Sequence, residues 1–388
     1  MIDHSKDLSR RLVPAVAAFM ERSGPLAAVA NRFAPGEESA RFEELAHGLF
    51  AVQYALNAPF QSLCRTRGLR PGCLASWRDI PGVPTAAYKD LEVTCLPIPE
   101  RTRVFHSSGT SLGRRGRHFH HRESLALYER SLAGWFSPSV LAEVPELEAG
   151  GQILPGESPA FLSLTPPAEA VPHSSLAHMF RTVVERFGAR DSVFGGRLDA
   201  DGAWELDLDQ VLLALRKSMC ANRPVFLLGT AFNYVQLLDH FEQNNVRYRL
   251  AVGSRVLETG GYKGRTREVP KAELHAALTR HLGIPATRIG CEYGMCELSS
   301  QAYDDPAAGD RRLRFPPWVR TRVLNPDTGN DVADGEPGVL QVLDLANAWS
   351  VMAIQTGDLA IRHPDGSFML LGRLPAAESR GCSLNVLA

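Results

Sequence analysis

The chain has 388 residues with 42 basic and 43 acidic side chains, and its formal net charge is −1. This balance excludes a general nucleic-acid binder, and 44% hydrophobic with 22% charged residues excludes large-scale disorder. No uninterrupted apolar run approaches the roughly 20 residues of a membrane-spanning helix, and no apolar segment follows the first residues as a secretory signal would. Seven cysteines form no Cys-x-x-Cys pair, which favours reduced thiols and a cytoplasmic protein.

The N-terminal part of the chain, residues 1–100, is predicted to be mainly helical. Apolar residues recur at helical spacing over residues 7–22 and 38–67. Pro59 falls late in the second of these segments and is expected to kink or divide it. An irregular lead-in then precedes a buried strand that ends at Phe105.

A loop rich in hydroxyls and glycines follows this strand, over residues 107–113. Small residues with permissive backbones can turn their N–H groups towards one point, and hydroxyls add donors, so such a loop suits the oxygens of an anion. Arg114, Arg115 and Arg117 add positive charge and forked donors that match phosphate. The loop alone leaves an alternative open, a flexible surface loop beside a solvated basic patch. No Gly-Lys-Ser/Thr closes it, which excludes a Walker A motif.

Residues 101–312 are predicted to form an α/β core. Buried strands are expected at residues 160–164, 224–229, 249–252 and 288–292. Helices are expected at residues 123–136, over the roughly 15 residues after Gly229, and at residues 270–282. Between these elements, residues 172–175 fit a helix N-cap and residues 258–261 a loop. Repeated strand–loop–helix units imply a parallel sheet covered by helices, in which ligands bind at the carboxyl ends of the strands.

The character of the sequence changes after residue 312, where short strand patterns are separated by turns. Strands are expected at residues 319–324, 339–343, 352–356, 359–362 and 368–371. The Asp365-Gly366 pair is a hairpin signal. We therefore predict an antiparallel β region over residues 313–388.

Three short stretches in these regions carry side chains suited to chemistry. Tyr293, Gly294 and Glu297 follow the last strand of the core and offer an aromatic face, close backbone approach and a carboxylate for a hard cation such as Mg²⁺. Asp358 is placed in a turn between two strands, where a carboxylate can accept hydrogen bonds from a ribose diol. Arg373 follows a Leu-Gly pair near the end of the chain. Each stretch alone also has a structural interpretation, as a turn or a cap.

Taken in chain order, these motifs resemble the set that is typical of the adenylate-forming (ANL) superfamily. The motifs are Ser-Ser-Gly-Thr-Ser-Leu-Gly at residues 107–113, Thr-Gly-Gly at 259–261, Tyr-Gly-Met-Cys-Glu at 293–297, Thr-Gly-Asp at 356–358, and Gly-Arg…Arg-Gly at 372–381. Segments similar to one branch, the LuxE-type acyl-protein synthetases, which are related to phenylacetate–CoA ligases, lie at residues 80–89, 258–265, 293–301, 344–347 and 380–384. The resemblance runs from about residue 40 to the end. It implies an α/β fold with helix-flanked, mostly parallel sheets and a C-terminal antiparallel β subdomain.

The resemblance implies that a carboxylic acid and MgATP react to give an acyl-adenylate and pyrophosphate. It places the ATP phosphates at Ser107, Ser108, Gly109, Thr110, Ser111, Gly113 and Arg114. It places the adenine and the α-phosphate at Gly260, Gly261, Tyr293, Gly294 and Cys296. Glu297 would bind Mg²⁺, Asp358 would hold the ribose hydroxyls, and Arg373 would contact ribose or phosphate. Two positions depart from the family pattern, since Cys296 is usually Thr or Ser and Arg114 stands where many relatives have a lysine.

The resemblance also bears on the acyl acceptor. Superfamily members usually continue into a mobile domain of about 100 residues that carries a catalytic lysine, and we expect this chain, which ends at Ala388, to lack it. In LuxE-type enzymes a cysteine near the C-terminus accepts the acyl group as a thioester and passes it to a reductase. Cys382 lies in the matching Arg-Gly-Cys-Ser context. The expected substrate is a fatty acid, and the expected partner is an acyl reductase or an acyl carrier.

Two other functions stay open at this stage. An acid–thiol ligase could use coenzyme A directly as the acceptor. A non-catalytic acyl- or nucleotide-binding scaffold could have kept the fold, with Cys296 as its support. The six other cysteines are expected to be core or incidental, and His118, His120 and His121 are interpreted as a solvated polar face rather than a metal site.

Overall fold

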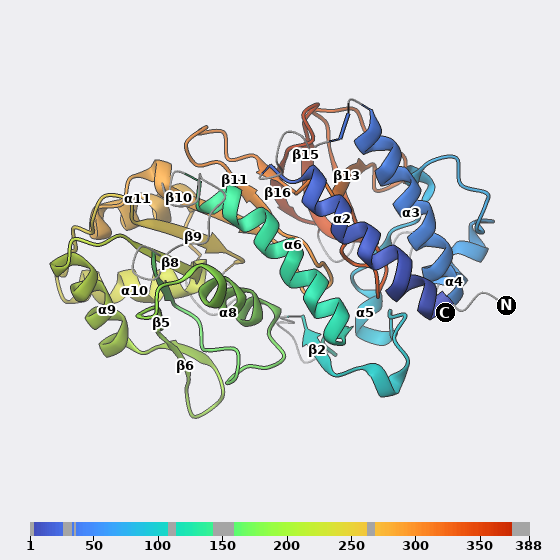
Figure 1. Ribbon diagram of the computed structural model, residues 1–388. Helices are drawn as coiled ribbons and strands as arrows, with labels where there is room; N and C mark the ends of the chain where they lie inside the picture. Colours follow the sequence, from blue (N-terminus) through green and yellow to red (C-terminus); the bar gives the residue numbers. More distant parts are fainter. Residues whose placement is uncertain are drawn as a thin grey trace. The chain divides into compact units, whose positions relative to one another are not determined.

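The computed structural model describes residues 4–25, 33–34, 36–107, 114–142, 159–261 and 268–374 (Figure 1). The chain divides into two compact units, each built from several segments. The first unit contains residues 1–135, 295–302 and 314–388, and the second contains residues 136–294 and 303–313. The three regions that the sequence suggests, 1–100, 101–312 and 313–388, stay a prediction.

Helices dominate the N-terminal part of the first unit, as the apolar periodicity predicts. They are α1 (His4–Asp7), the π-helical turn η1 (Leu8–Leu12), α2 (Val13–Ser23), α3 (Glu37–Leu56), α4 (Ala58–Thr66) and α5 (Ala87–Asp90), with 3₁₀ turns at Trp77–Asp79 and Ile98–Glu100. Pro59 divides the second predicted helix, because α3 ends before Asn57, whose side chain accepts a hydrogen bond from Phe60 N as the cap of α4. Phe42 packs edge-on against Phe19, which closes the helices over an aromatic core.

The first unit also contains a hairpin and an antiparallel sheet. Strands β2 (Arg103–His106) and β3 (Arg117–His120) form the hairpin. The sheet has the order β13 (Val319–Leu324), β14 (Pro337–Asp344), β15 (Ala353–Arg362) and β16 (Phe368–Arg373), and β1 (Val83–Pro84) pairs in parallel with β15. The hairpin predicted at Asp365-Gly366 is confirmed, since Gly366 has a φ of +80° between the antiparallel strands β15 and β16.

Strand β15 is a single strand where the sequence predicts two strands and a turn. The prediction of separate strands at residues 352–356 and 359–362 is wrong, because β15 runs from Ala353 to Arg362. The register against β16 shifts between Leu359 and Ala360, and a bulge of this kind bends a strand without ending it. Asp358 therefore lies within a strand, opposite Arg373.

The second unit is a parallel α/β structure, as predicted. Its sheet has the order β10 (Ile289–Tyr293), β9 (Arg255–Thr259), β8 (Val225–Thr230), β4 (Ala160–Ser163) and β5 (Val193–Phe194), with every pair parallel. Helices α9 (Leu208–Cys220), α10 (Ala231–Gln243) and α11 (Lys271–Leu282) share one buried cluster with these strands. Helix α8 (Ser175–Phe187) begins at the predicted N-cap, where Ser174 Oγ accepts a hydrogen bond from Ala177 N. The remaining elements are α6 (Arg122–Val140), the hairpin of β6 (Gly196–Leu198) and β7 (Trp204–Leu206), a 3₁₀ turn at Ala286–Arg288, β11 (Ala302–Asp304) and β12 (Leu313–Arg314).

One strand of the second unit lies further along the chain than predicted. Residues 249–252 form no strand, and β9 instead includes Glu258 and Thr259, which were expected in a loop. Val252 is 93% exposed and Gly253 has a φ of +99°, a backbone conformation that a regular strand does not contain. The chain turns there before the sheet resumes.

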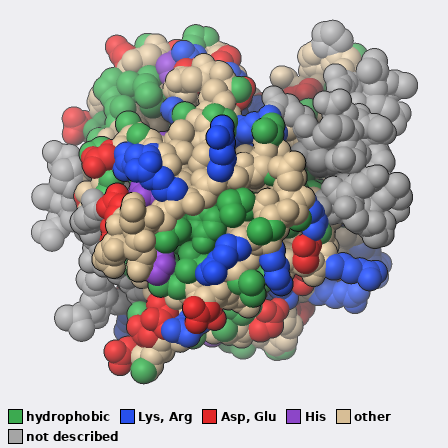
Figure 2. Space-filling model, turned by 90° about the vertical axis from the view of Figure 1, so that its left-hand side faces the viewer, with side chains coloured by type: hydrophobic (Ala, Val, Ile, Leu, Met, Phe, Trp, Pro, Cys, Tyr) green, Lys and Arg blue, Asp and Glu red, His purple; other side chains and the backbone are tan. Residues whose placement is uncertain are grey.

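Charges of both signs lie interspersed on the face drawn in Figure 2. This distribution matches the formal net charge of −1, and the described residues of that face form no extended patch of a single sign. Among the helices that the structure describes, none combines the length and apolar character needed to cross a membrane. The predicted α/β fold class is confirmed.

Candidate active site

The β2–β3 hairpin carries the hydroxyl- and glycine-rich loop. Ser107 donates its backbone N–H to Gly116 O at 3.0 Å, and the Ser107 hydroxyl accepts a hydrogen bond from Gly116 N at 2.8 Å. This pair closes the base of the loop. Five of the predicted phosphate-binding residues lie outside the described residues: Ser108, Gly109, Thr110, Ser111 and Gly113. The sequence predicts only the strand before the loop, and β3 after it was missed.

Glu297 and Ser107 converge on the same glycine of this hairpin. A Cβ atom added to Gly116 would lie 3.0 Å from Ser107 Oγ and 3.1 Å from Glu297 Oε1. Both contacts are tighter than ordinary van der Waals separations, so only glycine fits without displacing a neighbour. The sequence prediction missed Gly116, and its only signal was a glycine between Arg115 and Arg117.

The carboxyl group of Glu297 is buried, and among the described residues no counter-ion contacts it. Burial raises its pKa. Hydrogen bonds from its own backbone N–H and from the Cys296 thiol lower it, as do the charges of Arg373 and Lys89, but burial has the larger effect. Within the described part of the chain, no lysine or arginine forms an ion pair with Glu297, and Arg373 pairs with Asp358 instead. A buried carboxylate oxygen that has no ion-pair partner is a suitable ligand for a hard cation.

Neutral side chains hold the turn that carries Glu297. His118 Nδ1 lies 2.6 Å from Cys296 O, and Asn347 Nδ2 donates to Glu297 O at 2.9 Å and to Val351 O at 2.7 Å. Burial lowers the pKa of His118 to about 4, so its imidazole is neutral near pH 7. No part in positioning was predicted for His118, which was interpreted as part of a solvated face, or for Asn347, which lies in the family-like segment 344–347.

The interpretation of the three histidines as a solvated face is wrong. His118 and His120 are 1% and 2% exposed, and their ring centroids lie 4.2 Å apart. Residues two apart on a strand point to the same side, so both imidazoles of β3 face inward. His121 is half-buried and packs edge-on against Trp349. The expectation that they are not a metal site stays a prediction.

Asp344, at the end of β14, fixes the residues that follow Glu297. Its carboxylate accepts hydrogen bonds from Ser299 N at 3.0 Å, Ser300 Oγ at 2.8 Å and Ala346 N at 2.9 Å. Burial raises the pKa of Asp344 to about 6, although these hydrogen bonds oppose the shift. The turn at residues 295–300 is thus tied to the sheet of its own unit.

Asp358 and Arg373 form an ion pair across neighbouring strands. Arg373 Nε lies 3.0 Å from Asp358 Oδ1, and the two residues are direct partners in the register of β15 and β16. Asp358 is 7% exposed, whereas the Arg373 side chain is 84% exposed. A mostly buried carboxylate paired with an exposed guanidinium gives adjacent hydrogen-bond acceptors and donors at one edge of the sheet.

The arginines after the loop differ in how they are held. Arg114 is exposed, with its Nη1 3.9 Å from Asp90 Oδ1, and Arg115 is exposed as well. Arg117 is half-buried, and its Nη1 lies 3.6 Å from Glu92 Oε1. Arg114 and Arg115 therefore have the freedom to reach a ligand, while Arg117 is engaged in the fold.

The other predicted nucleotide residues belong to the second unit. Tyr293 is the last residue of β10, and Gly294 follows it as an exposed residue. Gly260 and Gly261 are exposed directly after β9, and Gly260 has a φ of +63°. Since β9 and β10 pair in parallel register, these residues all lie at the carboxyl ends of neighbouring strands.

The predicted acyl-accepting residue, Cys382, lies outside the described residues. Of the other cysteines, Cys73 and Cys220 are exposed, and those at 64, 95, 291 and 296 are buried. Burial places the pKa of the Cys296 thiol well above its usual value, so this side chain stays protonated and is a weak hydrogen-bond donor.

Solved structures share this fold at low sequence identity. A 2-hydroxyisobutyryl-CoA ligase in an open conformation, in complex with 2-HIB-AMP and CoA, is similar with a TM-score of 0.62 and 14% identity, covering 86% of this chain and 75% of that one. The same ligase in the postadenylation state, with 2-HIB-AMP, has a TM-score of 0.61 and 14% identity, covering 91% and 75%. The fold is that of the adenylate-forming ligases, as predicted.

The sequence comparison narrows this class to a family. The family described as acyl-protein synthetase, LuxE, matches residues 192–387. The chain therefore belongs to the LuxE acyl-protein synthetase family, which confirms the predicted branch. It is also 24% identical over 192 residues to the long-chain-fatty-acid–luciferin-component ligase of Aliivibrio fischeri, a match that covers 47% of this chain and 50% of the relative. The match thus spans about half the length of this curated relative.

Proposed function

We propose that this protein activates a carboxylic acid with ATP, forming an acyl-adenylate and pyrophosphate, and transfers the acyl group to a thiol. The observation that carries the proposal is the buried Glu297 carboxylate, which meets Ser107 at Gly116 in the base of a hydroxyl- and glycine-rich loop. Family membership supports the same chemistry. The enzyme class is an acid–thiol ligase.

The first unit would hold the phosphates and a magnesium ion. In this proposal the 107–113 loop and Arg114 bind the phosphate oxygens, and Glu297 binds Mg²⁺ through a carboxylate oxygen. The burial of Glu297 without an ion-pair partner among the described residues fits a cation at that position. Bound Mg²⁺ would offset the negative charge on the departing pyrophosphate. His118 and Asn347 keep the backbone of the Glu297 turn in place, so the carboxylate needs no rearrangement to act.

The nucleoside would be bound by residues from the ends of strands. In this proposal Tyr293 and Gly294 contact the adenine on one side, with Gly260 and Gly261 on the other, and Cys296 lies near the α-phosphate. Asp358 would accept hydrogen bonds from the ribose hydroxyls, and the exposed Arg373 would contact ribose or phosphate. The protein's contribution is to position an in-line attack of the carboxylate on the α-phosphorus.

The acyl acceptor is proposed to be Cys382. Its thiolate would attack the carbonyl carbon of the acyl-adenylate, forming the C–S bond of a thioester while the C–O bond to AMP breaks and AMP leaves. Arg380 lies two residues away in sequence and would favour the thiolate. A long-chain fatty acid as substrate is supported by the name of the Aliivibrio fischeri relative. An acyl reductase or acyl carrier is the receiver that the resemblance to the LuxE-type enzymes implies.

Two measurements test the activation and the transfer separately. Carboxylate-dependent exchange of labelled pyrophosphate into ATP is expected for the wild type and should fall by at least roughly 100-fold in Glu297→Gln, since the lost carboxylate contact acts on the transition state. Intact-protein mass spectrometry after incubation with MgATP and a panel of acids is expected to show one added acyl group on the peptide that contains Cys382. Full exchange activity in Glu297→Gln would contradict the metal role, and equal labelling of Cys382→Ala would contradict self-acylation.

Coenzyme A as the direct acceptor is the second candidate function. The 2-hydroxyisobutyryl-CoA ligase of similar fold was solved with CoA bound, which is the observation that favours it. Rapid acyl-CoA formation by Cys382→Ala would support this candidate over self-acylation. Exchange activity in the wild type would exclude the non-catalytic scaffold, whose only support is Cys296 in place of a threonine.

A further inference from the structure

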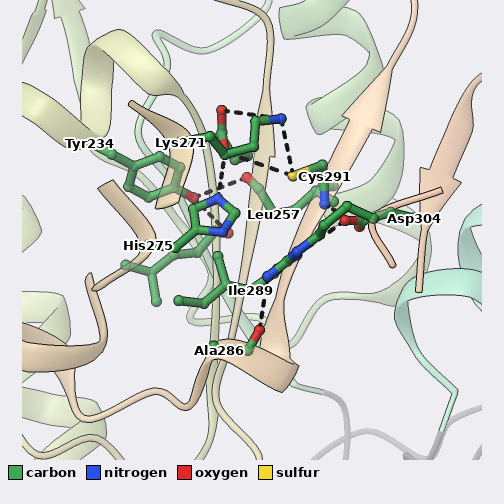
Figure 3. A network of polar contacts seen from close by, with 11 residues as sticks. Tyr234, Leu257, Lys271, His275, Ala286, Ile289, Cys291 and Asp304 are labelled. Atoms are coloured by element: carbon green, nitrogen blue, oxygen red, sulfur yellow. Dashed lines mark hydrogen bonds and ion pairs between the residues drawn. The ribbon is translucent and has the colours of Figure 1, made fainter. Parts of the chain in front are cut away.

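A second cluster of chemically active side chains lies within the second unit, apart from the residues assigned above. Glu258 of β9, His275 of α11 and Cys291 of β10 bring their ligand atoms within 4.8 Å of one another. His275 Nε2 lies 2.7 Å from Glu258 Oε2, and Cys291 Sγ lies 3.8 Å from the same oxygen. Figure 3 shows His275 and Cys291 directed towards one point beside Lys271. Each of the three residues is at most 5% exposed.

We propose that Glu258, His275 and Cys291 bind a divalent transition-metal ion of the zinc class. A carboxylate oxygen, an imidazole nitrogen and a thiolate sulfur are typical zinc ligands, and the sulfur disfavours Mg²⁺ and Ca²⁺. Tetrahedral zinc with bonds of about 2.0–2.3 Å places its ligand atoms roughly 3.3–3.6 Å apart. The separations of 2.7 and 3.8 Å depart from this spacing by less than 1 Å, and water would take the fourth position.

The sheet register accounts for the meeting of these side chains. Cys291 and Glu258 are direct partners in the parallel pairing of β10 and β9, so both point to the same side of the sheet. Val256 and Ile289, two residues earlier on each strand, are buried in the cluster that α11 covers, and His275 comes from that helix. Rigid elements on two layers therefore position all three ligands, as a metal site requires.

The backbone beneath Cys291 is fixed by a charged pair. Cys291 N donates to Asp304 Oδ1 at 2.5 Å, and Arg311 Nη1 lies 3.1 Å from Asp304 Oδ2 and donates to Ile289 O at 2.5 Å. Interactions of this kind orient the ligands of a metal and tune its affinity. They hold β10 in place whether or not an ion is bound.

Lys271 is the group that a metal ion would replace. Its Nζ lies 3.4 Å from Cys291 Sγ and 4.0 Å from Glu258 Oε1, and its side chain is 57% exposed, which gives it a path to solvent. Burial raises the pKa of the Cys291 thiol to about 12, so the metal-free thiol keeps its proton. Metal binding would release that proton to solvent and leave the imidazole proton of His275 on Nδ1.

The proposed ion would stiffen the strand ends that the proposed function uses. Thr259 and Glu292 are the next pair in register, and the Thr259 hydroxyl donates to the Glu292 carboxylate on the opposite side of the sheet. Tyr293 then ends β10, and Gly260 follows the end of β9. The metal site does not depend on the ligase activity, and its test uses metal binding alone.

Titration of the full chain with Co²⁺ after removal of bound metal provides that test. The wild type is expected to bind one equivalent with a sulfur-to-cobalt charge-transfer band, and Zn²⁺ should displace the Co²⁺. Cys291→Ser should abolish the band and weaken Zn²⁺ binding by more than roughly 100-fold, and His275→Gln should weaken it by at least roughly tenfold. Cys220→Ser, which removes an exposed thiol, is the matched control and should change neither signal.

Three results would overturn the proposal. They are a wild type that binds no Co²⁺, a charge-transfer band that persists in Cys291→Ser, and a band that disappears in Cys220→Ser. Circular dichroism and thermal melting without metal establish that each variant is folded. If Cys291→Ser fails to fold, His275→Gln decides, because an unchanged Zn²⁺ affinity in that variant excludes the site.

Discussion

Asp344→Asn is the substitution for which the structure makes the sharpest quantitative prediction. The variant keeps the size of the side chain and removes the charge of a carboxylate that is fully buried at the end of β14. An asparagine can accept only through its carbonyl oxygen, so its amide nitrogen would face either Ser299 N–H or the donors from Ser300 and Ala346. This mismatch leaves a buried donor unsatisfied and costs about 1–3 kcal/mol.

The negative charge of the Asp344 carboxylate destabilises the folded protein, in contrast to its hydrogen bonds, and this effect depends on pH. The folded pKa of Asp344 is raised to about 6 by burial, against about 3.9 in an unfolded chain. Between these values the folded protein holds a proton that the unfolded chain has released, so stability falls as pH rises from about 4 to 6. A difference of about two pKa units corresponds to about 3 kcal/mol. Asp344→Asn lacks this titration, so its destabilisation should shrink by about 2 kcal/mol between pH 4.5 and 7.5, because about 1 kcal/mol of the effect already falls below pH 4.5.

Thermal melting at several pH values provides the assay. For 388 residues the entropy of unfolding is about 0.8 kcal/mol per kelvin, so the melting difference between wild type and Asp344→Asn should change by roughly 2–3 °C over this pH range. Asp327→Asn, on an exposed turn, controls for the loss of one carboxylate from the net charge. A melting difference that stays constant with pH would refute the reasoning, because it would mean that the donors around Asp344 outweigh its burial.

Three further substitutions probe the site and its support. Gly116→Ala should lower pyrophosphate exchange by roughly 10–100-fold with little change in melting temperature, because its Cβ would press against Glu297 Oε1; unchanged exchange would argue against Glu297 as a ligand. Arg373→Ala should raise the KM for ATP by roughly tenfold while the unfolding free energy changes by less than about 1 kcal/mol, since the Arg373 side chain is 84% exposed and its ion pair is screened by solvent on that side. Trp318→Phe should lower the unfolding free energy by about 1–3 kcal/mol in urea titrations, because the buried indole N–H bonds two serine hydroxyls; a neutral effect would show that the core repacks.

The fold could be predicted from the sequence wherever local periodicity and packing agree. Helices α3, α10 and α11 and the buried strand β8 follow directly from the spacing of apolar residues. The apolar residues at 249–252 also fit a strand pattern, yet the chain turns at Gly253 and Val252 stays in solvent. The local sequence pattern does not distinguish that segment from β9, because strand formation depends on which of the two segments pairs with a neighbouring strand.

The candidate site could be predicted in part, through motifs rather than geometry. Glu297, Asp358 and Arg373 were found because they fall in motifs typical of the family, and their roles stay predictions. Gly116 and His118 were missed because their importance comes from contacts with residues about 180 positions away. Gly116 is required because a larger residue would contact a carboxylate that is distant in sequence, and the residues next to Gly116 in the chain do not indicate this.

The surroundings of Glu297 explain why its sequence motif alone does not show whether the carboxylate can bind a cation. Among the described residues, the groups that fix its turn bring no positive charge to the carboxylate, since His118 and Asn347 bind carbonyl oxygens and Asp344 accepts from N–H and O–H donors. A lysine or arginine in contact would have stabilised the carboxylate and removed its affinity for a cation. Because no positively charged group carries the positioning, the charge of Glu297 stays available for a ligand. The sequence shows the carboxylate, but the absence of a counter-ion among the described residues emerges only from the structure.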